Sequence, residues 1–257
     1  MSSSHSIDWR TTPAAIWRGR SQTFRPVPHP DPVRLEDLLG IDTQKAKIIQ
    51  NTERFLRGQP CNHVLLWGSR GTGKSSIVKA LLNEYAPRGL RVIEVDKDDL
   101  HDLPDIVDDI RERSQRFVVY CDDLSFEDGE NQYKHLKSVL EGSLELPPEN
   151  VRLYATSNRR HLVPEYMKDN EQSQVMNREI HHGDVVEEKI SLSDRFGLGL
   201  SFYPISEAQY FEIVDHLFGE VEDRDALHVR ARRFSMEKGV RSGRTARQFY
   251  NQFVGEL

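Results

Sequence analysis

The chain has 257 residues, of which 37% are hydrophobic and 30% charged, and its formal net charge at pH 7 is -6. This length and composition allow one sizeable core with a small second domain, and no apolar run approaches the ~18 residues of a membrane-spanning helix. The acidic balance gives no overall attraction to nucleic acid, and the first residues lack the basic flank and apolar stretch of a secretory signal. We therefore expect a cytoplasmic protein with no membrane partner.

The first 34 residues differ in composition from the rest. They are rich in serine and then in proline, with Trp9, Trp17 and Phe24 set among arginines. A segment this polar cannot bury a core of its own, so we predict an extended arm over residues 1–34. Its aromatic side chains would pack over the chain's own domain or dock on a partner subunit, and the sequence leaves both open.

Residues 35–205 show strands alternating with helices. A helical pattern with Asp42 as N-cap runs to a stop at Gly58, and short apolar runs bounded by turn residues follow it. Such alternation predicts an α/β fold whose parallel sheet is covered on both faces. We predict strands at residues 63–67, 91–95, 117–121, 151–156 and 199–202, and helices at residues 75–85, 104–114 and 133–141.

Two other segments stand apart from this pattern. Residues 206–257 carry helical patterns only, which predicts a small all-helical lid at the C-terminal end. Residues 165–189 are polar and long for a connection inside the α/β domain. They would form either a partner-binding insertion or a mobile polar loop.

The stretch LLWGSRGTGKSS, residues 65–76, carries a phosphate-binding motif. Gly68, Gly73, Lys74 and Ser75 fit G-x-x-x-x-G-K-[ST] between a predicted strand and a predicted helix. In this motif backbone N–H groups surround the phosphates, the lysine reaches the terminal phosphates and the hydroxyl ligates Mg²⁺. We expect nucleotide contacts from Gly68, Ser69, Arg70, Gly71, Thr72, Gly73, Lys74, Ser75 and Ser76, with Ser75 also a metal ligand.

Acidic and amide side chains follow two other predicted strands. The run FVVYCDDL ends in Asp122, placed to hold the metal through water, and Asp123, placed to polarise an attacking water. Asn158 follows the strand VRLYAT and would orient that water or contact the γ-phosphate. Without the phosphate loop, such acids and amides would read as ordinary turn residues at strand ends.

Arginines near the end of the chain supply candidate phosphate contacts. Arg195, in the run SLSDRFGLGLSF, could reach transferring phosphate charge from a neighbouring subunit, although an arginine before a strand usually forms a surface salt bridge. In RSGRTARQF, Arg244 is the best placed of three arginines to reach the nucleotide from the lid, because Gly243 permits a close approach.

Taken in order, these features resemble the AAA+ P-loop ATPases. They are similar to Walker A at residues 68–75, Walker B at 117–123, sensor 1 at Asn158, the arginine-finger region at 191–196 and sensor 2 at Arg244. The runs FVVYCDDLSFE, YATSNRRHLV, SLSDRFGL and RSGR further resemble the bacterial AAA+ family catalogued as domain of unknown function 815. The resemblance covers about residues 35–253.

The resemblance implies a fold, cofactors and an assembly. The fold would be a five-stranded parallel sheet of order 5-1-4-3-2 with a helical lid, and ATP with Mg²⁺ would bind between them. Adenine would lie near Leu39, Gly40 and Ile41. The site would be completed in a homo-oligomer by Arg195 of the next subunit, acting in trans as a catalytic group with Lys74, Asp123 and Asn158.

The use made of ATP is less defined than its binding. Asp123 stands where most AAA+ enzymes have glutamate, so hydrolysis is expected but slow. We expect an ATPase that drives a conformational change on a protein or DNA partner, or alternatively an ATP-gated switch of the loader or initiator type. A P-loop small-molecule kinase would not need the paired acids and the lid, no N-K-x-D motif indicates a GTPase, and DKDDLHDLP lacks the aromatic residue of a threading loop.

Overall fold

The computed structural model describes residues 7–126, 136, 139–140, 146–159, 162 and 192–256. Most of the helix expected at 133–141 and all of the segment 165–189 lie outside these residues. The strands of the described part are β1 (Ala14–Arg18), β2 (Thr23–Pro26), β3 (Val64–Gly68), β4 (Leu90–Glu94), β5 (Arg116–Cys121), β6 (Val151–Ser157) and β7 (Leu198–Phe202). The helices and short 3-10 turns are η1 (Leu35–Asp37), α1 (Asp42–Leu56), α2 (Lys74–Tyr85), η2 (Ala86–Arg88), η3 (Lys97–Asp102), α3 (Leu103–Ile110), α7 (Glu207–Phe218), α8 (Arg224–Lys238) and α9 (Gly243–Phe253).

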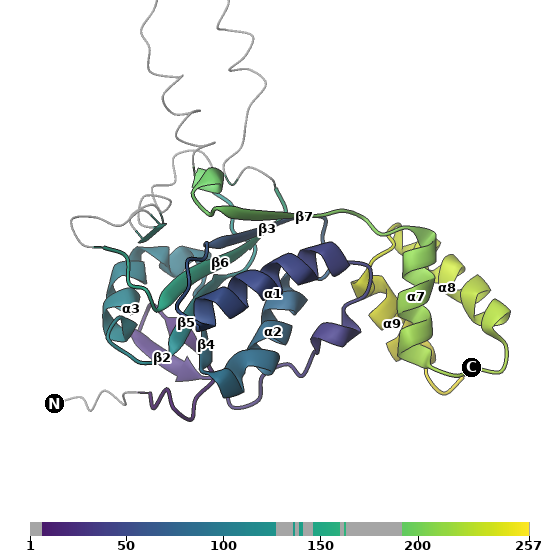
Figure 1. The fold of residues 1–257 in the computed structure, drawn as a ribbon. Coiled ribbons are helices and arrows are strands. Elements are labelled where there is room, and N and C mark those ends of the chain that lie inside the picture. Colours follow the sequence, from purple (N-terminus) through teal and green to yellow (C-terminus); the bar gives the residue numbers. More distant parts are fainter. Residues whose placement is uncertain are drawn as a thin grey trace, which may run out of the picture.

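The described strands form one sheet of order β2-β1-β4-β5-β6-β3-β7 (Figure 1). Its five strands from β4 to β7 are all parallel, and they are the five strands predicted from the sequence. Because β3 is the first of the five in the chain, their order is 5-1-4-3-2 when read from β7. The predicted α/β fold and strand order are therefore confirmed.

An N-terminal hairpin extends this sheet by two strands. β1 pairs antiparallel with β2, with Trp17 opposite Phe24, and it pairs parallel with β4. Trp9 and Trp17 are buried, and both form edge-on aromatic contacts with Phe24. Our prediction of an extended arm was wrong for residues 14–26, because pairing with the open edge of β4 is a tertiary effect that local composition does not reveal.

Two apolar cores lie on opposite faces of the sheet. Along β5, Phe117, Val119 and Cys121 face the core that α3 covers, whereas Val118 and Tyr120 face the core under α1 and α2. This alternation follows from the two-residue repeat of a strand. Both sets are buried, which explains why the run FVVYC is apolar throughout.

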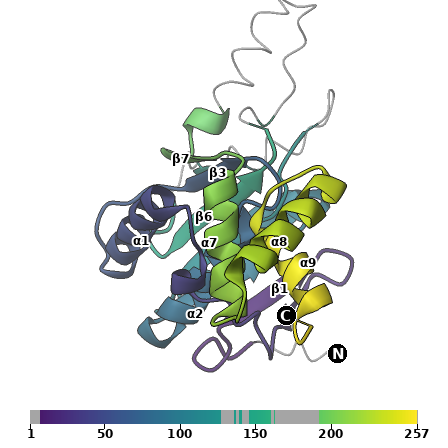
Figure 2. The same cartoon turned by 90° about the vertical axis from the view of Figure 1, so that its right-hand side faces the viewer.

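Helices α7, α8 and α9 form the predicted all-helical lid with a core of its own (Figure 2). Phe249 and Tyr210 are fully buried in that core. Each helix begins with a side-chain cap, from Ser206, Asp223 and Ser242 respectively, which satisfies backbone donors of the first turn. Among the described residues, no helix has the length and apolar character needed to span a bilayer.

Candidate functional site

The phosphate loop connects β3 to the first turn of α2. Gly73, the N-cap of α2, has φ 97°, a left-handed conformation that glycine adopts without steric cost. Gly68 has φ 129°, and a Cβ atom there would collide with the carbonyl oxygen of Phe202. The two glycines thus allow the chain to turn tightly at the helix N-terminus, where exposed N–H groups and the helix dipole favour an anion.

Lys74 is held inside this loop. Its Nζ atom donates hydrogen bonds to the carbonyl oxygens of Gly68 (2.8 Å) and Ser69 (2.7 Å), and to Oδ1 of Asn158 (3.3 Å). Burial lowers the pKa of Lys74, whereas the nearby carboxylates of Asp122 and Asp123 act in the opposite direction. The ammonium group is therefore positioned by the loop itself and lies between the loop and the two acids.

Asp122 is the acceptor at the centre of a hydrogen-bond network. Its Oδ1 atom accepts from the hydroxyls of Ser75 (2.8 Å), Tyr120 (2.8 Å) and Thr156. Burial alone would raise the pKa of Asp122, but these hydrogen bonds outweigh it and the pKa is lowered. An ionised carboxylate beside a serine hydroxyl provides the hard oxygen ligands that Mg²⁺ prefers.

Asp123 adopts an unusual backbone conformation next to Asp122. Its φ of 51° is rare for a residue with a side chain, and its N–H donates to Oγ1 of Thr156 (2.8 Å). The Asn158 amide donates to Oδ1 of Asp123, and a guanidinium nitrogen of Arg70 lies 3.9 Å from Oδ2. The structure therefore brings Asp123 and Asn158 together and leaves the carboxylate of Asp123 accessible from the cleft.

Thr156 is a site residue that sequence reasoning missed. Its hydroxyl donates to Asp122 and accepts from the N–H of Asp123, so it fixes both acids. Thr156 lies on β6 next to Ala155, which is paired with Cys121 at the end of β5. Asp122, the residue after Cys121, therefore lies opposite Thr156. A buried threonine near the end of an apolar strand was the available signal, but its use depends on the pairing of β6 with β5.

A cavity of about 1160 Å³ lies between the α/β domain and the lid. Most predicted nucleotide contacts line it, but Gly68, Ser69 and Gly40 do not. Arg195 lies in the turn before β7, half-buried and away from this cavity. The predicted residues that do line the cavity are Leu39, Ile41, Arg70, Gly71, Thr72, Gly73, Lys74, Ser75, Ser76, Asp122, Asp123, Asn158 and Arg244.

The lid contributes more of the cavity wall than the sequence suggested. Arg244 lines the cavity as predicted, and its N–H lies 3.4 Å from the carbonyl oxygen of Gly71 in the phosphate loop. Arg247 and Gln248, one turn further along α9, line it as well. Their spacing of three and four residues from Arg244 places them on the same helical face, a signal that we did not use.

The model of a family described as "Protein of unknown function (DUF815)" matches residues 10–257. The chain belongs to this family. For this DUF815 protein the family resemblance of the sequence is thus confirmed, and the match includes most of the N-terminal segment as well as the lid.

Solved structures with the same fold are AAA+ ATPases. A mutant RuvB of Thermotoga maritima superposes with a TM-score of 0.53 at 14% identity, over 86% of the DUF815 chain and 73% of that chain. DnaA of Aquifex aeolicus, solved with AMPPCP bound, gives a TM-score of 0.56 at 17% identity, over 88% and 68% of the two chains. These likenesses establish the AAA+ fold.

One curated relative matches a shorter stretch of the sequence. The replication factor C large subunit of Staphylothermus marinus is 37% identical over 76 residues. The match covers 29% of the DUF815 chain and 17% of the length of that protein. The chain therefore spans only a small part of that relative.

Proposed function

We propose that this DUF815 protein binds ATP with Mg²⁺ in the cleft between its α/β domain and its lid, and hydrolyses it to ADP and phosphate. The observation that carries the proposal is the single network in which Ser75, Asp122 and Thr156 meet Asp123 and Asn158 beside the lysine of the phosphate loop. Such a network combines ligands for a metal with a carboxylate and an amide that face the cleft.

The residues present fit this cofactor pair. The left-handed glycines and Lys74 would hold the phosphates, and Ser75 with Asp122 would hold the metal, directly or through water. When bound, Mg²⁺ neutralises negative charge on the phosphate oxygens. Asp123 would accept a proton from water, and the Asn158 amide, already donating to that carboxylate, would fix its orientation.

Two kinds of use for ATP remain in contention. One is a remodelling ATPase that acts on a protein or nucleic-acid partner in the cytoplasm, and the other is a slow switch of the loader or initiator type. Asp123 has a shorter side chain than the glutamate of most AAA+ enzymes, and the slow hydrolysis expected from it favours the switch. The run DKDDLHDLP, which would have to grip a threaded polypeptide, contains η3. Two hydrogen bonds fix η3 to the N-terminal hairpin: the Trp17 indole donates to Asp102 (2.8 Å) and the Gly19 N–H donates to Asp99 (3.1 Å). A polypeptide-threading role is therefore disfavoured.

We further propose a homo-oligomer in which Arg195 reaches the cleft of the next subunit. Arg195 does not line the cavity of its own subunit, which supports action in trans. Mixing Arg195→Ala with Asp123→Asn protein should restore part of the turnover, because one interface then pairs an intact arginine with an intact acid. Co-assembly without any recovered turnover would contradict this role.

The central experiment measures phosphate release from Mg²⁺-ATP by the full chain, with no added acceptor. Turnover without an acceptor is expected for an ATPase and excludes a small-molecule kinase. Asp123→Asn should retain nucleotide binding and lose turnover. A large increase in a slow basal rate on adding DNA or a protein partner favours the switch, whereas undiminished turnover in Asp123→Asn contradicts the assigned chemistry.

A further inference from the structure

The far end of the cleft from the phosphate loop is walled by a segment that lies between β2 and α1. Asp31, Pro32, Val33 and Asp37 line the cavity together with Leu217 of α7. We call residues 31–37 the strap. A nucleotide with its phosphates at Lys74 would extend its ribose and base toward this end, so the strap is a wall for the nucleoside and not for the phosphates.

Burial holds the strap only in part. None of residues 31–37 is buried. A smaller cavity of about 170 Å³ lies between α2 and the strands β1, β4 and β5, and Asp31 at the start of the strap lines one side of it. Apolar packing of the strap rests on Leu35, which is partly buried against the core under α1 and α2, and polar contacts fix its two ends.

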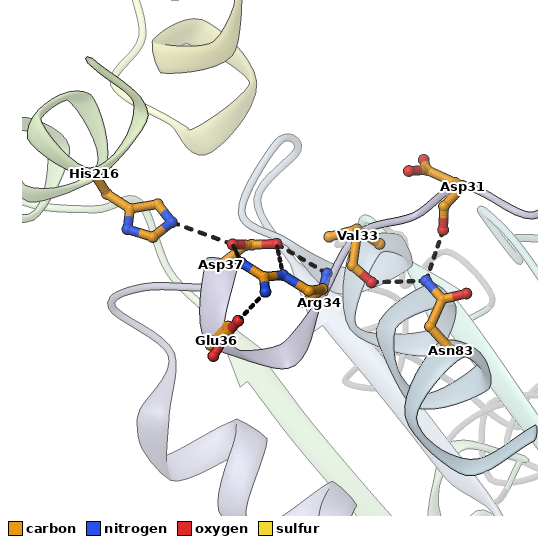
Figure 3. A network of polar contacts seen from close by, with 7 residues as sticks. All are labelled: Asp31, Val33, Arg34, Glu36, Asp37, Asn83 and His216. Carbon is orange, nitrogen blue, oxygen red and sulfur yellow. Dashed lines mark hydrogen bonds and ion pairs between the residues drawn. The ribbon is translucent and has the colours of Figure 1, made fainter. Parts of the chain in front are cut away.

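Asn83 of α2 fixes the first end of the strap. Its Nδ2 atom donates to the carbonyl oxygen of Asp31 (2.7 Å) and to that of Val33 (2.8 Å), so both amide protons are used (Figure 3). The ion pair of Lys79 with the Asp31 carboxylate (3.1 Å) is exposed and adds little. Since α2 begins at Lys74, one helix positions both the phosphate loop and the strap.

Asp37 connects the other end of the strap to the lid. Its carboxylate accepts from the Arg34 N–H (3.1 Å) and lies 3.3 Å from Nε2 of His216 on α7 (Figure 3). Burial alone would raise the pKa of Asp37, but the hydrogen bonds from Arg34 and His216 outweigh it and the pKa is lowered. Arg34 also pairs with Glu36, which keeps its guanidinium group beside η1.

We infer that Asn83 and His216 are positioning residues that hold the strap as the nucleoside wall of the cleft, so that the protein selects a nucleotide over a bare polyphosphate. The inference rests on the proposed function. Neither residue needs to touch the phosphates: Asn83 acts through the backbone of Asp31 and Val33, and His216 acts through Asp37. Because His216 belongs to the lid, this contact couples the position of the strap to that of the lid.

The test compares two ligands that each carry a chain of three phosphorus groups, one attached to a nucleoside and the other without one. AMPPCP and inorganic tripolyphosphate, each with Mg²⁺, are titrated into the full chain and into Asn83→Asp, which keeps the shape of the side chain but cannot donate to the two carbonyls. We expect AMPPCP affinity to fall about 10-fold and tripolyphosphate affinity to change less than about twofold, where tenfold is ~1.4 kcal/mol. Asn83→Ala should behave in the same way without adding a charge.

Control variants separate positioning from folding. Glu84→Gln changes the exposed neighbour of Asn83 on the same helix and should leave both affinities and the melting temperature unchanged. Equal loss of both ligands in Asn83→Asp and Asn83→Ala, or no loss of AMPPCP, would overturn the inference while the proposed function stands. Failure of the wild-type chain to bind either ligand would overturn the proposed function itself.

The lid contact is tested by a double-mutant cycle. His216→Gln and Asp37→Asn should each weaken AMPPCP about threefold, and the double variant should be no weaker than the single ones, because the two residues act as one pair. Tripolyphosphate affinity should stay within about twofold of wild type. Additive losses, or equal effects on the two ligands, would contradict a strap held by the lid.

Discussion

The two ends of the cleft are built in different ways. At the phosphate end, Lys74 and Thr156 are 7% and 2% exposed, and the groups that meet there follow the adjacent strands β3, β5 and β6. At the nucleoside end, the continuous segment 31–41 meets α7 from a distant part of the chain, and the two include no buried polar side chain that faces the cleft. The first end is built within one domain, whereas the second depends on the contact between the lid and the strap.

This difference predicts a gradient of mutational effects along the cleft. Groups at the phosphate end are already paired and cannot be replaced by solvent without leaving partners unsatisfied. Groups at the nucleoside end are partly hydrated in the free protein, so removing one costs less. The expected effects fall in this order, from the phosphate end of the cleft to the exposed ion pair of the strap.

Lys74→Ala should give the largest loss of ligand affinity. The ammonium group is the positive charge held inside the phosphate loop, so binding of both ligands should weaken by at least ~100-fold, or about 3 kcal/mol. Calorimetry with Lys47→Ala, an exposed lysine on α1, serves as the control and should match wild type. Wild-type affinity in Lys74→Ala would remove the basis for a phosphate site.

Thr156→Val should reduce ATP turnover by more than ~10-fold, because leaving the Asp123 N–H without its acceptor costs about 1–3 kcal/mol and releases both acids from their fixed orientation. The control is Thr52→Val, which removes another buried threonine hydroxyl, bonded to Tyr154 away from the cleft. Both variants should lose thermal stability, but only Thr156→Val should lose turnover. Equal turnover in the two would mean that Thr156 has a structural role alone.

Leu39→Ala should have a moderate effect that is restricted to the nucleoside. Partial loss of an apolar wall costs about 1 kcal/mol, so AMPPCP affinity should fall roughly fivefold. Tripolyphosphate, which lacks the base, should bind as it does to wild type. A matching loss of tripolyphosphate would show that the two ends of the cleft are not independent.

Lys79→Ala should have the smallest effect, although Lys79 lines the cavity and pairs with Asp31 of the strap. Both partners are about half exposed, and exposed ion pairs contribute about 0–1 kcal/mol, so AMPPCP affinity should change less than about twofold. Calorimetry at low and high salt checks this expectation. A loss of AMPPCP affinity as large as that in Asn83→Asp would mean that the Lys79–Asp31 ion pair, and not the Asn83 amide, holds the strap.

The same contrast explains which features the sequence predicted. Lys74, Ser75 and Asp122 were predictable because the phosphate loop is contiguous and because an acid ending a parallel strand must lie beside it. The five strands were predictable from apolar runs between turn residues. Arg244 was identified by its glycine neighbour, and it lines the cleft as expected.

What the sequence did not predict depends on contacts between distant residues. Thr156 acquires its role only when β6 lies against β5, and His216 only when the lid brings α7 to Asp37. The N-terminal hairpin was missed for the same reason. Polar composition predicted an arm, whereas Trp9 and Trp17 are buried in the core only because β1 pairs with the edge of β4. The predicted boundary at residue 35 therefore separates β1 and β2 from the sheet to which they belong.

That hairpin has a consequence for the behaviour of shortened chains. A protein that began at Leu35 would expose the backbone of β4 along its whole edge and uncover the apolar side chains beneath Trp9 and Trp17. An open edge of this kind is a template for pairing with another chain, so the shortened protein should aggregate through β4. Light scattering on such a protein would measure aggregation through the exposed edge of β4. The native association of subunits should therefore be measured on a chain that retains residues 7–34.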